Sequence, residues 1–128
     1  MPFAALTKPL KECRIGVVTS ADQGAADIPQ DELPRSDRLF RAENAAYDSL
    51  SRDKFWDREA TNTDDPESYL PLRRLAEYAT SGRIGALNHR FFGVPTDYSQ
   101  RLTLEDDAPR IEAWMREDAI NAAILVPL

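Results

Sequence analysis

Apolar residues in this chain follow two patterns, short continuous runs and stripes at helical spacing. The runs at residues 14–20 and 122–128 are rich in small or branched apolar side chains, which is typical of buried strands. Another run, at residues 89–95, predicts a short strand or a packed loop. Because these runs lie far apart in the sequence, a sheet that contains them needs long connections between its strands.

Three stretches have the i, i+3, i+4 spacing of a half-buried helix, and their stripes are Leu72, Leu75, Ala76 and Ala79; Leu104, Ala108, Ile111 and Met115; and Leu39, Ala42, Ala46 and Leu50. Pro71 suits the first turn of the first helix, where a missing N–H is tolerated. Pro109 favours a start of the second helix at Asp107 rather than Thr103, because proline is disfavoured inside a helix. For the third helix, predicted over residues 36–52, Ser36 is a candidate N-cap.

Strand, helix, short strand, helix and strand in this order predict an α/β fold with an open, mainly parallel sheet flanked by helices, a Rossmann-like three-layer arrangement. The 128 residues suit a single domain, 1–128, in which residues 31–69 form an acidic insertion over one end of the sheet. Chain termini usually trail onto the surface, whereas this chain stops with its last predicted strand. We therefore weigh an ordinary terminal strand against an incomplete domain.

Composition narrows the class of protein. The net charge is −6, and residues 31–69 hold 6 basic and 11 acidic residues, a local charge of −5. Phosphate backbones are bound by clustered cations, so nucleic acid is a poor candidate partner. With one cysteine and one histidine, the chain predicts neither an internal disulfide framework nor a closed zinc site. Prolines and a lysine interrupt the first ten residues, and no apolar run approaches the roughly 20 residues of a membrane span, so we expect a soluble cytoplasmic protein.

The best ligand-side candidates in the sequence are Thr19 and Ser20, at the carboxyl end of the first predicted strand. In open α/β sheets, ligands bind just beyond these strand ends. The loop that follows lacks the G-x-G-x-x-G spacing, so a dinucleotide is not indicated. Cys13 lies at the opposite end of the same strand, which favours a structural role for the thiol.

Four further side chains carry suitable chemistry, each with a simpler alternative. The guanidinium groups of Arg73 and Arg74 suit a substrate carboxylate, although a solvated or salt-bridged pair is the simpler interpretation. Asp65 is either a functional carboxylate or a helix cap. His89 has the near-neutral pKa of an acid–base group, but a lone histidine is more often structural.

Two short motifs stand close together, Pro-Leu-Arg-Arg-Leu at residues 71–75 and Gly-Arg-Ile-Gly-Ala-Leu at residues 82–87. Together they resemble the glycine/sarcosine/betaine reductase and D-proline reductase selenoprotein B family. Further similar segments are spread over most of the chain: Cys13–Ser20, Asp37 with Phe40 and Arg41, Phe92 with Gly93, and Ala119–Pro127.

The resemblance implies that a redox residue, either selenocysteine or a cysteine in its place, follows the final strand almost at once. A second cysteine often lies nearby. Because the selenocysteine codon ordinarily means stop, we expect Leu128 to precede a UGA codon read as a terminator. The chain would then be the amino-terminal fragment of a longer selenoprotein. A selenol ionises more readily than a thiol, and strand-end N–H groups or helix N-termini lower the pKa of such nucleophiles.

The family further implies an oxidoreductase subunit that cleaves a C–N bond reductively in a small amino-acid-like substrate, activated by a pyruvoyl group on a partner subunit. Other reductase subunits would be its partners. No catalytic residue is then expected in this chain, which alone would be inactive. Its substrate-side candidates would be Thr19, Ser20, Asp65, Arg73, Arg74 and His89.

Two alternatives stay open. One is a complete, non-catalytic α/β binding or assembly domain that docks a partner subunit through Phe91, Phe92 and the final strand. The other is that the fragment forms a homo-oligomer, dimerising through the exposed apolar surface left by its missing half.

Overall fold

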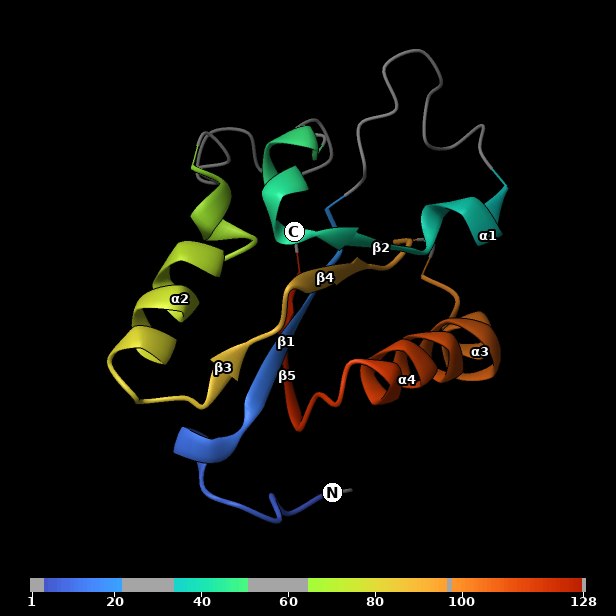
Figure 1. Cartoon of the computed structure of the whole chain (residues 1–128). Coiled ribbons are helices and arrows are strands. Elements are labelled where there is room, and N and C mark those ends of the chain that lie inside the picture. The colour runs from blue at the N-terminus through green and yellow to red at the C-terminus, as the bar shows by residue number, and fades with distance from the viewer. Residues whose placement is uncertain (1–3, 22–33, 51–64, 97, 128) are drawn as a thin grey trace.

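The computed structural model describes residues 4–21, 34–50, 65–96 and 98–127, which form an open α/β sheet with helices on both faces (Figure 1). The strands in this part of the chain are β1 (Arg14–Thr19), β2 (Phe40–Glu43), β3 (Ala86–Leu87), β4 (Arg90–Gly93) and β5 (Ala122–Val126). Along one edge of β1, β3 pairs with its first residues and β4 with its last, whereas β5 runs along the other edge. These pairs are parallel, and only β2 is antiparallel, to β4. The predicted fold class is confirmed.

The helical elements of the described residues are η1 (Leu10–Glu12), α1 (Arg35–Arg38), η3 (Asn44–Ser49), η4 (Pro66–Ser68), α2 (Leu72–Thr80), α3 (Gln100–Leu102), η5 (Thr103–Asp107) and α4 (Ala108–Glu117). Figure 1 shows α2 on one side of the sheet and α3 and α4 on the other. The hydrophobic core has two parts, one on each face of the sheet. Ile15 and Val17 belong to the part on the α2 side, and Val18 packs in the other part with Ile111 of α4. Within the described residues, no helix is long and apolar enough to cross a membrane.

The predictions with strong local signals are confirmed. Strand β1 ends one residue before the predicted limit, and the run at residues 89–95 contains the short strand β4. Helix α2 has the predicted stripe, with Leu72 and Leu75 buried and Pro71 at the N-cap. Of the loop predicted after β1, residues 22–33 lie outside the described part of the chain.

The helix predicted over residues 36–52 is wrong for the described part of that range. Instead of one helix, the segment contains α1, then β2, then the 3-10 turn η3. In β2, Phe40 and Ala42 are buried while Arg41 and Glu43 are exposed, the period-two pattern of a strand. Of these two buried residues only Ala42 lies on the predicted helical stripe, and pairing with β4 makes Phe40–Glu43 a strand.

The second helical segment begins earlier than either predicted start. Ser99 caps it, accepting a hydrogen bond from the Leu102 N–H at 3.3 Å, and a π-helical turn, η5, comes before Pro109. A wide turn at this point accommodates the proline ring inside a continuous helix. Leu104, predicted to be on the buried stripe, is exposed, whereas Trp114 stacks on Phe92.

Strand β5 forms where predicted, but the prediction that it is buried is wrong. The side chain of Leu125 is 72% exposed and that of Ile124 is 38% exposed, on opposite faces of the strand. In the described part of the chain β5 pairs with β1 alone. Its outer edge therefore has no neighbour there, and neither face is fully covered.

A buried polar junction fixes the end of α4 against the sheet. Asp118, which follows the helix, accepts hydrogen bonds from Arg90 Nε at 3.1 Å and from Asn88 Nδ2 at 2.9 Å. A second guanidinium nitrogen of Arg90 pairs with the other carboxylate oxygen. Burial raises the pKa of Asp118, but the hydrogen bonds from Arg90 and Asn88 outweigh that effect and hold the pKa below its ordinary value.

This junction predicts a site-specific loss of stability. Asp118→Asn should lower the free energy of unfolding at pH 7, measured in urea, by about 2 kcal/mol, because a buried carboxylate loses its charge and its charge-assisted hydrogen bonds from Arg90 and Asn88. Because the folded-state pKa of Asp118 is depressed, its contribution is present above the unfolded pKa of about 4 and is lost as the pH falls through the folded value. The difference between variant and wild type should therefore shrink in acid.

The matched control is Glu117→Gln, one residue earlier. Glu117 pairs with Arg41 on the surface, and such pairs contribute less than about 1 kcal/mol. Equal losses for the two variants would contradict the structural role of Asp118.

Candidate functional site

The sheet contains one point at which its winding reverses. From β1 the chain crosses through α2 to β3 and β4, and it then returns through α4 to β5 on the other edge of β1. Because such parallel crossovers are right-handed, opposite directions of travel place α2 and α4 on opposite faces. The carboxyl ends of β1 and β5 therefore mark a topological switch point, the place where ligands bind in open α/β sheets.

The predicted residues Thr19 and Ser20 lie at this switch point. Thr19 is fully buried, and its Oγ1 accepts a hydrogen bond from the Ala21 N–H at 3.1 Å. The Ser20 N–H donates to the Val126 carbonyl at 3.4 Å, which joins the ends of the two strands. Thr19 thus shapes the strand end, while the partly exposed Ser20 is the better placed of the two to meet a ligand.

A groove of about 510 Å³, called here the α4 groove, opens beside these strand ends between α4 and β5. Its walls are mostly apolar and include Val18, Ile111, Met115, Ala123, Leu125 and Val126. The polar groups that reach it belong to Thr19, Ser20, Thr103, Asp107 and Glu112. Small-molecule sites are usually apolar clefts of this size with a few polar groups. A groove that another helix covers has the same features.

Asp107 is the polar wall residue that sequence reasoning missed as a site group. Its buried carboxylate accepts from Arg35 Nη1 at 2.6 Å and pairs with the second guanidinium nitrogen of Arg35 as well. Arg35 Nη1 also donates to Asp106 at 3.3 Å. The sequence offered Asp107 only as a helix cap. Neither the pairing with Arg35, 72 positions away, nor the π turn η5, a feature common at functional sites, is visible in the local sequence.

The predicted residues Asp65, Arg73 and Arg74 lie together at the start of α2, apart from the α4 groove. Arg73 Nη2 donates to Asp65 at 3.1 Å, and the Arg73 and Arg74 backbone N–H groups donate to the Glu67 carboxylate at 2.8 Å and 3.0 Å. Glu67 thus supplies the negative charge that a helix N-terminus favours. Asp65 also caps η4, accepting from the Glu67 N–H at 3.1 Å. The capping and ion-pair roles are therefore realised in the structure.

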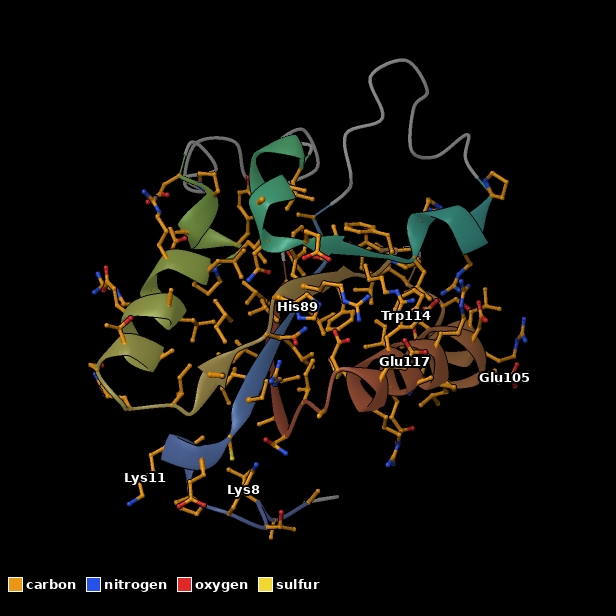
Figure 2. All side chains as sticks on the ribbon, viewed as in Figure 1. Lys8, Lys11, His89, Glu105, Trp114 and Glu117 are labelled. Carbon is orange, nitrogen blue, oxygen red and sulfur yellow. The ribbon has the colours of Figure 1, made fainter. Side chains whose placement is uncertain are left out.

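His89 and Cys13 lie away from both groups. His89 is exposed in the break between β3 and β4 (Figure 2), and its carbonyl accepts a hydrogen bond from the Asn44 N–H at 2.9 Å. Cys13 is fully buried where β1 begins, with its Sγ 3.4 Å from the Pro9 carbonyl oxygen. The thiol therefore lies at the amino end of the strand, remote from the switch point.

Among the described residues, no cluster of His, Cys, Asp and Glu could hold a metal ion. Comparison with protein-family models, with curated proteins and with solved structures finds no match to this chain. The function proposed below therefore rests on the geometry of the switch point and on the motifs in the sequence.

The groove makes a direct prediction about apolar ligands. Leu125→Ser should weaken the binding of an apolar fluorescent dye severalfold, because it removes an exposed wall of the groove. Its effect on the free energy of unfolding should stay within about 0.5 kcal/mol. Leu104→Ser is the matched control, since Leu104 is 66% exposed but lies outside the groove. Equal effects of the two variants on dye binding would contradict the α4 groove as the apolar site.

Proposed function

We propose that this chain is the amino-terminal part of an oxidoreductase subunit that resembles selenoprotein B of the glycine, sarcosine, betaine and D-proline reductases. Its redox group, a selenol or thiol, would follow Leu128. The observation that carries the proposal is the position of β5, whose carboxyl end lies beside that of β1 at the switch point. A residue placed just after β5 would therefore stand where this class of fold binds its ligands.

The surroundings of β5 support the same proposal. A strand with apolar residues on both faces is typical of the interior of a parallel sheet rather than of an edge. A further right-handed crossover leaving β5 in the direction already taken from β4 would place its helix on the α4 face. That helix would cover the α4 groove, and the strand after it would pair with the outer edge of β5.

A pyruvoyl group on a partner subunit would make the substrate nitrogen a better leaving group. The selenolate or thiolate would attack the adjacent carbon, so that a carbon–chalcogen bond forms as the C–N bond breaks, and the nitrogen would leave with the bonding electron pair and take up a proton. A dithiol reductant would then supply the two electrons that release the reduced carbon, which takes up a proton, and restore the nucleophile. The chain's own thiol has no part in this step, because Cys13 is buried at the opposite end of β1. Ser20, at the joined ends of β1 and β5, is the described residue that would meet the substrate side, because the added helix would cover the rest of the α4 groove.

The proposal also names the partners of the protein and its compartment. Other reductase subunits, one of them carrying the pyruvoyl group, would be its partners, and the cytoplasm its compartment. The 128-residue chain alone would have no reductase activity, since the nucleophile lies outside it.

A second candidate is a binding or assembly domain without catalysis. The uncharged edge of β5 favours it, because an open strand edge without charged residues readily accepts another strand. Phe91 and Phe92 cannot take part in such docking, since both are fully buried in the core. The surface suggested by the sequence is thereby reduced to the final strand.

Sequencing the gene downstream of codon 128 separates the two candidates. The reductase proposal predicts an in-frame UGA followed by an open frame with a cysteine codon and further alternating strand and helix patterns. If no open reading frame continues after codon 128, the reductase proposal is overturned, and the binding or assembly domain is the remaining candidate. A polypeptide translated through the UGA should then show reductase activity with the partner subunits, and the 128-residue chain should show none.

A further inference from the structure

A second hollow lies at the amino-terminal ends of the strands, opposite the switch point at their carboxyl ends. It has a volume of about 490 Å³ and is bordered by Lys8, Lys11, Glu12, Arg14 and Asn121, with the backbone at Gly85. We call it the basic hollow, because three of these side chains are cations and one is an anion. Figure 2 shows Lys8 and Lys11 near η1, at the end of the molecule where β1 begins.

The cations of the basic hollow differ from most others in the described residues in lacking an ion pair. Arginines elsewhere on the sheet and helices, among them Arg35, Arg90 and Arg116, pair with carboxylates. No carboxylate in the described part of the chain forms an ion pair with Lys8, Lys11 or Arg14. In a chain of net charge −6, the three cations and the single carboxylate of Glu12 leave the basic hollow with a local excess of positive charge.

The hydrogen-bonding groups of the basic hollow are also predominantly donors. Asn121 Oδ1 already accepts from the Arg14 backbone N–H at 2.8 Å, so the Asn121 amide nitrogen remains to donate. The two ammonium groups and the guanidinium add only donors. Apart from Glu12, the side chains around the hollow therefore offer donors and positive charge.

We propose that the basic hollow binds a small oxyanion that carries at least two negative charges, on phosphate or carboxylate groups. Charge-assisted hydrogen bonds from Arg14 and the two lysines would hold the oxygens. A concave surface of this volume fits a small molecule better than the flat face of a protein partner. This inference is independent of the proposed reductase function. It concerns the amino-terminal ends of the strands and involves none of the residues placed at the switch point.

Titration of the isotopically labelled 128-residue chain with inorganic pyrophosphate, followed by NMR at constant ionic strength, tests the proposal. Saturable shifts are expected for the amides of Lys11, Arg14, Gly85 and Asn121. The double variant Lys8→Gln with Lys11→Gln should bind about tenfold more weakly, since each exposed charge contact contributes roughly a factor of three. The double variant Arg101→Gln with Arg116→Gln changes the net charge equally on the α3 and α4 side and should bind pyrophosphate as the wild type does.

The titrations have outcomes that support the oxyanion site and outcomes that overturn it. Saturable shifts that the lysine variant alone weakens support the site, and a parallel titration with citrate shows whether carboxylates serve as well as phosphates. Absence of saturation, or equal weakening in both double variants, would mean that pyrophosphate senses only the net charge, which overturns the proposal. Shifts produced by an acidic peptide but not by pyrophosphate or citrate would overturn it in favour of a protein-docking surface.

Discussion

The position of β1 is the constraint on which the rest of the structure depends. This strand pairs with β3, β4 and β5, and its side chains alternate between the two core clusters. Parallel neighbours on both edges require crossovers in opposite directions, and the handedness of crossovers then places α2 and α4 on opposite faces. The switch point, the α4 groove and the candidate ligand side all follow from this arrangement.

Two contacts lie where the chain passes from α4 into β5. Asp118, fixed by Arg90 and Asn88, ends α4, and the turn that follows leads Ile120 onto β1 at Gly16. A Cβ on Gly16 would lie 2.8 Å from the Ile120 side chain, so glycine makes room for the return of the chain. Strand β5 then runs beside β1 from Ile15 to Thr19, and its carboxyl end arrives beside Ser20.

The sequence allowed the fold class, β1 and α2 to be predicted, because the two elements have strong local signals. For β1 the signal is a continuous apolar run, and for α2 it is an apolar stripe that begins after Pro71. It misled at residues 36–52, where Leu39, Ala42 and Ala46 suit one helical face, but pairing with β4 makes Phe40–Glu43 a strand. The apolar run identified β5 as a strand. It could not show how exposed the side chains of β5 are, because their exposure depends on which segments pack against the strand. The ion pair of Arg35 with Asp107 joins residues 72 positions apart, so no local pattern could reveal it.

The sequence placed Thr19 and Ser20 at the carboxyl end of the first strand, where the structure has them, but it did not show the groove beside them, whose walls come from four separate segments of the chain. We propose that β5 is an inner strand of a longer reductase subunit. The most direct measurement is the intact mass and selenium content of the native protein purified from its source. The account predicts a mass well above 14.4 kDa with bound selenium, whereas a selenium-free protein of 14.4 kDa would contradict it.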